Sequence, residues 1–300
     1  MSVRSVAAMV GGGAASLVAA GWLEAHAFRV VRHEVTLPVG AAAPSRVRIL
    51  HLSDIHYMRG QAAKARFVAS LVGLEPDLVI LTGDLLSDDG GFDEFIEALS
   101  SLFAVPGAFV FGSNDYFGPT HANPLAYLFQ KPGQVRPGGR ALLSWRPVRD
   151  AMLATGWCDL NNARRRLDVA GLTVELRGAG DAHIGLDDYA AGAPVGDVSA
   201  GRPADLVLGV THAPYRRVLD AMVADGVPLI LAGHTHGGQI CLPWGAIVTN
   251  CDLPPAMAKG LWRYRGASWL HVTAGVGTAP TFPLRLFCRP EACLLEVTLV

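Results

Sequence analysis

Short, mostly apolar runs recur along the chain, and polar or glycine-rich residues follow many of them. Runs of this length are typical of strands that are buried on both faces. We therefore predict strands over residues 47–52, 78–81, 108–111, 172–176, 206–210, 229–232, 269–272 and 292–300. Apolar residues at helical spacing predict amphipathic helices over residues 62–74, 92–103 and 148–156. This alternation of strands and helices predicts an α/β (α+β) core.

An uncharged, apolar stretch over residues 6–23 precedes this core. A helix of about 18 apolar residues can just span a bilayer. We interpret residues 1–27 as an N-terminal membrane anchor, which predicts a single transmembrane helix and a cell-membrane location. A cleaved secretory signal and a buried amphipathic helix are the alternatives. Arg4 precedes the stretch and Arg29 and Arg32 follow it, so the positive-inside rule leaves the membrane face of the domain uncertain.

The same pattern divides the rest of the chain. Residues 28–45 are predicted to form a linker and a leading strand, because polar and apolar residues alternate from Glu34 to Leu37 as in an edge strand. Residues 46–300 would form one large domain. Between residues 119 and 151 several prolines and a Gly-Gly pair interrupt the pattern. This stretch is interpreted as either a lid beside a site or a plain surface loop.

Composition narrows the possible functions. The chain has 300 residues, 51% hydrophobic and 17% charged, which is enough for one large core or two smaller ones. A net charge of −1 provides no basic field, so no nucleic-acid partner is expected. The chain has five cysteines, an odd number, and no two of them form a CxxC motif. We therefore expect them to be small buried side chains and not a disulfide framework.

Five polar patches lie at or just after predicted strands. They are Asp54-Ile55-His56, Gly83-Asp84, Gly112-Ser113-Asn114-Asp115, Thr211-His212 and Gly233-His234-Thr235-His236. Ligands of α/β sheets gather at the carboxyl ends of the strands, so we expect these patches to meet at one point. Side chains two residues apart at a strand end lie on the same side of it.

Carboxylates, imidazoles and an amide together form a ligand set for two neighbouring divalent metal ions. Mixed oxygen and nitrogen donors suit Mn, Fe or Zn better than Mg or Ca. Two divalent ions held by Asp54, Asp84 and neutral imidazoles would keep a positive charge. Such a centre would attract a phosphate anion and activate water as a nucleophile.

The patches also resemble a known family. The motifs D-x-H, G-D, G-N-H-D, a later single His and G-H-T-H-x-G-Q are those of the calcineurin-like metallophosphoesterases. This chain has four of the five motifs, and the resemblance runs from about Val47 to the C-terminal strand. Residues 52–56, 233–239, 243–245 and 275–278 are most similar to the membrane-associated bacterial phosphodiesterases of that family.

The resemblance implies both a fold and a ligand set. The fold would be a four-layer metallophosphoesterase β-sandwich flanked by helices. The implied ligands are Asp54, His56 and His236 for a first ion, Asp84 as the bridge, and Asn114, His212 and His234 for a second ion.

The third motif departs from the family pattern. In place of Gly-Asn-His-Asp the chain has Gly112-Ser113-Asn114-Asp115. An ungapped alignment makes Ser113 the ligand, whereas a one-residue shift, absorbed by a β-bulge in the preceding strand, keeps Asn114. We adopt the shift because an amide oxygen is a better ligand than a neutral hydroxyl. The motif histidine is missing either way, and the candidates to replace it in catalysis are Asp115, His183 and His121.

Several other residues have two interpretations each. His51 and His271 would be satisfied core residues or part of the site. Asp181 and His183 would belong to a turn or face the substrate. Residues 164–166, all arginine, would be a solvated turn or a site for an anionic head group. Trp244 and Phe282 would be core residues or line an apolar groove.

These observations together predict a membrane-anchored, dinuclear-metal phosphohydrolase, specifically a phosphodiesterase. Its partners would be the membrane and a phosphoester of a membrane or envelope component, for example a lipid-linked one. The alternative is a metal-binding sensor or binding protein of the same fold with little or no turnover, which the altered third motif favours.

Overall fold

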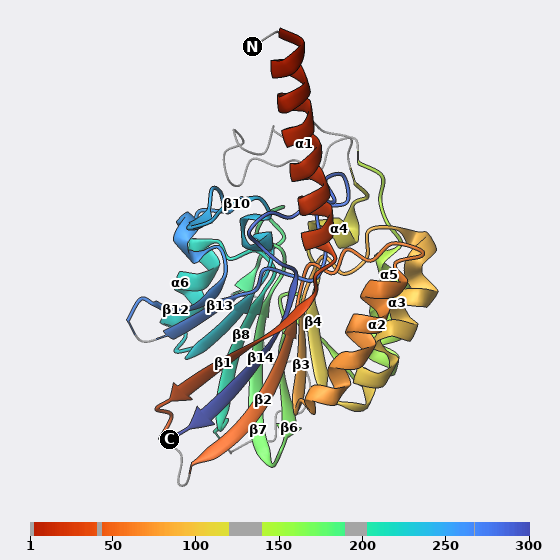
Figure 1. Cartoon of the computed structure of the whole chain (residues 1–300). Coiled ribbons are helices and arrows are strands. Elements are labelled where there is room, and N and C mark those ends of the chain that lie inside the picture. Colours follow the sequence, from red (N-terminus) through yellow and green to blue (C-terminus); the bar gives the residue numbers. More distant parts are fainter. Residues whose placement is uncertain (1–2, 41–43, 120–139, 190–202, 267) are drawn as a thin grey trace.

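Two six-stranded sheets lie face to face in a computed structural model that describes residues 3–40, 44–119, 140–189, 203–266 and 268–300 (Figure 1). The first sheet has the order β1-β14-β2-β3-β4-β5. Its strands are β1 (Arg29–Leu37), β14 (Glu291–Leu299), β2 (Ser45–Leu52), β3 (Leu78–Thr82), β4 (Gly107–Val110) and β5 (Cys158–Asp159). β1 pairs parallel with β14, β14 pairs antiparallel with β2, and β2 to β5 are parallel.

The second sheet has the order β12-β13-β9-β8-β7-β6. Its strands are β12 (Gly260–Tyr264), β13 (Ser268–Val272), β9 (Leu229–Ala232), β8 (Leu206–Thr211), β7 (Leu172–Ala179) and β6 (Arg164–Val169). The four central strands are parallel, and the two edge strands pair antiparallel with their neighbours. A small hairpin of β10 (Cys241–Leu242) and β11 (Gly245–Ala246) lies outside both sheets.

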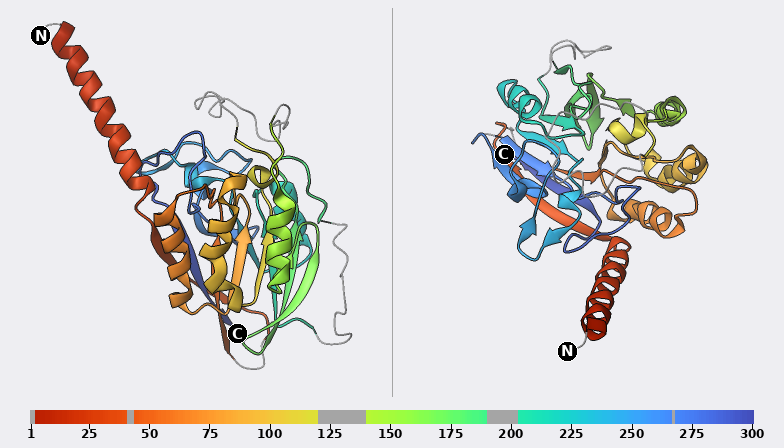
Figure 2. Two further views of the ribbon diagram at one scale, coloured as in Figure 1. Left: turned by 90° about the vertical axis from the view of Figure 1, so that its right-hand side faces the viewer. Right: turned by 90° about the horizontal axis from the view of Figure 1, so that it is seen from above.

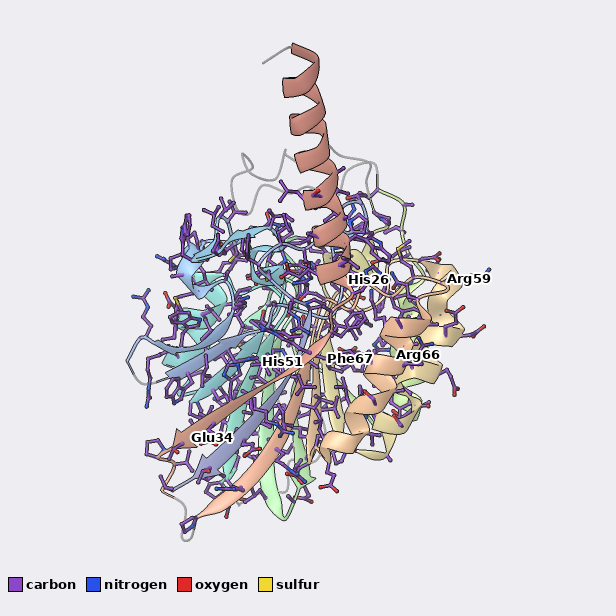
Figure 3. The ribbon with its side chains drawn as sticks, viewed as in Figure 1. His26, Glu34, His51, Arg59, Arg66 and Phe67 are labelled. Atoms are coloured by element: carbon purple, nitrogen blue, oxygen red, sulfur yellow. The ribbon has the colours of Figure 1, made fainter. Side chains whose placement is uncertain are left out.

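Helices cover the outer face of each sheet (Figures 1 and 2). They are α2 (Ala62–Ser70), α3 (Phe92–Leu99) and α5 (Trp145–Ala154) on the first sheet, and α6 (Arg216–Ala224) on the second. On α2, Phe67 faces inward and stacks on Phe28 with ring centroids 5.1 Å apart, whereas Arg66 is exposed (Figure 3). A further short turn, α4 (Ser113–Tyr116), follows β4.

Three apolar clusters hold the layers together. The first lies between the sheets and joins residues such as Ile49 of β2 to residues such as Leu208 of β8. The second packs the first sheet against α2, α3 and α5, and the third packs the second sheet against α6. The order helix, sheet, sheet, helix confirms a mixed α/β sandwich flanked by helices, as the resemblance implied.

The first helix, α1 (Val3–Ala25), projects away from the body of the molecule (Figures 1 and 2). Its last turns are fixed to the domain, because the backbone N–H of Arg285 donates to the Gly21 carbonyl at 3.0 Å. The Glu24 carboxylate also accepts from the N–H groups of Phe287 and Cys288. In the described part of the chain no helix is both long and apolar enough to cross a membrane, so the transmembrane prediction for residues 1–27 is not supported.

Two further expectations need correction. Residues 164–166 are not a solvated turn but begin the edge strand β6, where Arg166 forms an ion pair with Glu175 of β7 at 2.8 Å. The irregular stretch predicted over residues 119–151 ends earlier than expected, because α5 already begins at Trp145. Residues 120–139 of that stretch, including His121, lie outside the described residues.

Gly107 provides a test of the packing between β4 and the segment after α5. A Cβ at this position would come within 2.3 Å of the Trp157 ring, which is itself buried in the second cluster. We expect Gly107→Ala to lower the free energy of unfolding by about 1–3 kcal/mol through overpacking. The measurement is the urea midpoint. Gly73→Ala is the matched control, because its Cβ would meet nothing within 4 Å; equal midpoints for the two variants would contradict the packing argument.

Candidate metal centre

All five polar patches meet where strands of the two sheets end. β2 leads to Asp54 and His56, β3 to Asp84, β4 to Asn114, β8 to His212, and β9 to His234 and His236. Five of these side chains stand on left-handed backbone, with φ of 48° at Asp54, 44° at His56, 52° at Asp84, 72° at His234 and 50° at His236. Such conformations are uncommon for residues other than glycine and cluster at functional sites.

Four of the predicted ligands form one compact group. One ligand atom from each of Asp54, His56, Asp84 and His236 lies within 4.8 Å of the others. The Nε2 atoms of His56 and His236 are 3.2 Å apart, and Asp84 Oδ2 lies 3.4 Å from His56 Nε2. Asp54 Oδ1 is buried without a hydrogen-bond partner. A divalent cation among these atoms would supply that missing partner, so the residues fit the first predicted ion.

The remaining ligands gather on the other side of Asp84. Asp84 Oδ2 lies 3.6 Å from His212 Nε2, which is 3.3 Å from His234 Nδ1. His212 Nδ1 donates to the Thr82 carbonyl at 2.6 Å, and His234 Nε2 donates to the Asn250 carbonyl at 3.1 Å. These bonds fix the rings, so that His212 Nε2 faces Asp84 and His234 Nδ1 faces His212 Nε2. A carbonyl partner on the other ring nitrogen is the usual arrangement around metal-binding histidines.

The altered third motif brings Asn114 to the carboxylate of Asp84, which is predicted to bridge the ions. Asn114 Nδ2 donates to Asp84 Oδ2 at 2.6 Å, and its backbone N–H donates to Asp84 Oδ1 at 2.8 Å. The predicted β-bulge is wrong, because the β3–β4 register is regular from Val79–Gly107 to Thr82–Val110. Asn114 instead reaches Asp84 from the helical turn α4. Its role as a metal ligand stays a prediction.

The Asp115 carboxylate bonds the backbone of the loops that follow β3 and β4. Its Oδ1 accepts from the N–H groups of Leu85 and Leu86, and its Oδ2 accepts from those of Asp84 and Gly112. Burial, and then the charge of Asp84, raise the pKa of Asp115 to about 7, although these hydrogen bonds oppose the shift. The geometry is that of a residue that positions the loops; a catalytic role for Asp115 stays a prediction.

His183 lies on the side of the second ligand group. Its ring centroid is 4.4 Å from that of His234, and its Nδ1 is 3.0 Å from the Tyr215 hydroxyl. Asp181 accepts the backbone N–H of His183 at 2.8 Å, so it also shapes this turn. Burial, and then the charge of His212, lower the pKa of His183 to about 4. The predicted catalytic role of His183 is untested, and its position is compatible with it.

The electrostatics of the centre are dominated by the buried carboxylates. Burial alone would raise the pKa of Asp84, but His212, His56 and Asn114 hold it well below its usual range. Burial would lower the pKa of His212, but Asp84, Asp181 and Asp54 raise it to about 9. Burial lowers the pKa of His56 to about 4. Asp84 is therefore anionic and His56 neutral near pH 7, which are the forms that bind cations.

Sequence analysis missed two arginines beside the centre. Arg140 donates through Nη2 to Asn114 Oδ1 at 2.6 Å and to the Phe117 carbonyl at 2.8 Å. Arg285 is completely buried and donates to backbone carbonyls that include those of His236 at 3.2 Å and Ala274 at 2.7 Å. Neither lies in a motif. The pair Gly139-Arg140 follows an irregular stretch, and Arg285 lies in a loop without periodicity, so no sequence signal could have identified them.

The remaining candidates lie away from the ligands. His51 and His271 are buried between the sheets, with their Nδ1 atoms 2.8 Å apart. Trp244 is 82% exposed in the β10–β11 turn, so the core interpretation is wrong for this residue. Phe282 is half-buried.

Comparison with known proteins identifies the family of this chain. The chain matches the calcineurin-like phosphoesterase family over residues 47–238. It is 28% identical over 279 residues to phosphodiesterase YaeI of Escherichia coli (strain K12), which covers 90% of this chain and 88% of that protein. It is 24% identical to the uncharacterized metallophosphoesterase YkuE of Bacillus subtilis (strain 168), covering 90% and 85%. A transmembrane protein with metallophosphoesterase domain from Bos taurus is 26% identical, covering 86% of this chain and 54% of that protein. The chain belongs to the calcineurin-like phosphoesterase family and is a metal-dependent phosphoester hydrolase.

Proposed function

We propose that this enzyme is a phosphodiesterase with a dinuclear centre of Mn, Fe or Zn. Asp54, His56 and His236 would hold one ion, Asn114, His212 and His234 the other, and Asp84 would bridge them. The observation that carries the proposal is the position of Asp84 Oδ2, which lies 3.4 Å from His56 Nε2 and 3.6 Å from His212 Nε2. One carboxylate between two imidazole groups is suited to bridging two cations.

Two bound ions would polarise the phosphoryl oxygens and lower the pKa of water. The chain itself would orient the ester. If the Asn114 amide oxygen held an ion, Arg140 Nη2 would be free of that acceptor and could donate to a phosphoryl oxygen of the ester. His183 is the candidate to transfer a proton to the leaving group, with the Tyr215 hydroxyl orienting its ring. Because burial lowers the pKa of His183 to about 4, this role requires that the negative charge of the bound ester raise that pKa so that the ring becomes protonated. Asp115 would keep the loops of Asp84 and Gly112 in place.

The proposed substrate is a phosphodiester of a membrane or envelope component, acted on by an enzyme held at the cell membrane through its N-terminal segment. The uncharged residues 6–23 and the exposed side chains of Leu17, Val18 and Trp22 on α1 support this proposal. Two relatives, one named a phosphodiesterase and the other a transmembrane protein, also support it.

The first prediction tests the bridge. Full-length enzyme with Mn²⁺ should hydrolyse an aryl phosphodiester. In Asp84→Asn the rate of this hydrolysis should fall by more than about 100-fold, which is the largest loss usual when a residue that only supports a ligand is removed. Metal content measured on the same samples should fall in Asp84→Asn. Asp168→Asn, on the exposed edge of β6, is the control and should keep both values. Metal bound without turnover of any phosphoester would support the sensor alternative, and unchanged turnover in Asp84→Asn would exclude the bridge.

The second prediction separates the roles of His183 and Asp115. His183→Gln should slow hydrolysis of an alkyl phosphodiester by about 100-fold or more, because its leaving group needs a proton, and affect an aryl ester much less. Asp115→Asn should slow both esters by the same factor, since a loop-positioning residue does not act on the leaving group. The readout is kcat for each ester. Equal losses in His183→Gln would contradict the proton-transfer role.

The third prediction concerns location. The full-length chain should sediment with membranes and need detergent for release. Leu17→Asp combined with Val18→Asp should shift it to the supernatant, because charges oppose burial of α1 in lipid. Val72→Asp, an exposed apolar position on the domain, is the control and should leave the distribution unchanged. Membrane recovery of the double variant at the level of the unaltered chain would contradict attachment through α1.

A further inference from the structure

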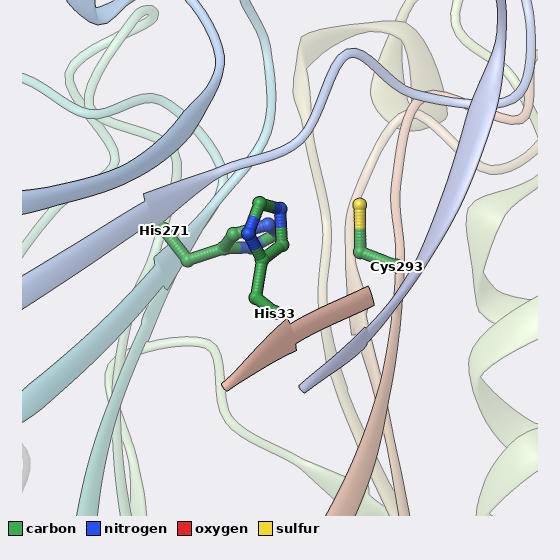
Figure 4. Close-up of side chains that lie close together, drawn as sticks. All are labelled: His33, His271 and Cys293. Atoms are coloured by element: carbon green, nitrogen blue, oxygen red, sulfur yellow. The ribbon is translucent and has the colours of Figure 1, made fainter. Parts of the chain in front are cut away.

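A second cluster of metal-ligating side chains lies between the two sheets, apart from the metal centre. His33 of β1, His271 of β13 and Cys293 of β14 each offer one ligand atom, and these atoms lie within 4.8 Å of one another (Figure 4). None of the three contributes to the five motifs. We propose that this cluster, here named the inter-sheet cluster, binds a further metal ion of the zinc class.

Strand register explains why these side chains meet. Cys293 pairs with Val31 of β1 on one side and with His51 of β2 on the other. His33 is two residues beyond Val31, so its side chain lies on the same face of the first sheet as Cys293. That face packs against the second sheet, because Cys293 and Leu295 belong to the cluster of apolar residues between the sheets. His271 reaches the same point from the opposite sheet.

One ring nitrogen of His271 has no bonding partner in the cluster. Its Nδ1 is 2.8 Å from His51 Nδ1, and the other nitrogen of His51 is 2.8 Å from the Thr82 hydroxyl. His271 Nε2 has no hydrogen-bond partner, although the residue is completely buried. Buried polar atoms nearly always have a partner. A cation on Nε2 would supply one and would leave the Nδ1 proton to be donated to His51, the arrangement usual for metal-binding histidines.

The protonation states fit a cation as well. Burial is the main cause that lowers the pKa of His33 and of His271, so both rings are neutral near pH 7 and keep lone pairs. Cys293 is buried, and burial raises the pKa of its thiol, so a cation would be needed to hold the thiolate form. The Glu291 carboxylate lies 3.9 Å from Cys293 Sγ and is itself paired with Arg29 at 2.8 Å.

Donor chemistry and geometry favour zinc. Two imidazoles and a thiolate form a soft ligand set, which Mn²⁺ and Mg²⁺ do not prefer. With Zn–N of about 2.0 Å and Zn–S of about 2.3 Å, tetrahedral ligand atoms lie about 3.3–3.6 Å apart, so small side-chain rotations would close the cluster. His33 is half-buried on the edge strand β1, which gives an ion a route from solvent.

The test uses the full-length chain, stripped with a chelator and loaded with Co²⁺ as a spectroscopic substitute for zinc. A cobalt–thiolate charge-transfer band is expected, which the cysteine-free ligand set of the metal centre cannot produce. Cys293→Ser should remove the band and lower the metal content by one ion per chain. Cys251→Ser, a buried cysteine outside the cluster, is the matched control and should change neither.

His33→Gln guards against misfolding of the Cys293 variant, because His33 lies half-buried on an edge strand. This variant should bind Co²⁺ at least about 10-fold more weakly, as followed by titration of the charge-transfer band. Its circular dichroism spectrum should be unchanged. Zn²⁺ should displace the cobalt from this site, and Mn²⁺ at the same concentration should not. Absence of the band in the unaltered chain, its persistence in Cys293→Ser, or displacement by Mn²⁺ would overturn the proposal.

Discussion

Two carboxylates without access to solvent, Asp54 and Asp84, are the constraint on which this structure depends. Both are at most 2% exposed at the junction of the sheets, and a buried charge is tolerated only when it is paired and hydrogen-bonded. The imidazoles of His56, His212 and His236 surround them for this reason. Because Asp84 remains anionic and the imidazoles of His56 and His236 remain neutral near pH 7, these side chains are in the forms that bind cations.

Two buried side chains hold the loops that carry these ligands: a carboxylate that accepts backbone N–H groups and a guanidinium that donates to backbone carbonyls. Asp115 collects four backbone N–H groups from the loops after β3 and β4. Arg285 collects backbone carbonyls from the loops around His236, Ala274 and Cys288. Left-handed backbone is uncommon for residues other than glycine, and two of the left-handed ligand positions, Asp84 and His236, are bonded through their backbone to Asp115 and Arg285. A site of this kind is rigid because its loops are bonded through the main chain.

Much of the fold and of the ligand set could be predicted from the sequence. Apolar runs predicted the central strands, because a strand buried on both faces needs no polar residue, and motif residues after each run predicted where Asp54, Asp84 and His212 would meet. The rest depended on long-range packing. Arg140 reaches Asn114 from 26 residues away, and residues 164–166 form a strand because they pair antiparallel with β7, where Glu175 also binds Arg166. No local pattern contains that information, nor the meeting of His33, His271 and Cys293.

The last strand of the chain, β14, lies between β1 and β2. These two strands are consecutive in sequence, yet each forms its ladder with the C-terminal segment. During synthesis they emerge from the ribosome long before their shared partner exists, and unpaired strand edges invite association with other chains. A product of premature termination that lacks β14 would therefore contain the predicted ligands of the metal centre, but it would lack Cys293 of the inter-sheet cluster. Its β1 would have no partner strand, and its β2 would be paired only with β3.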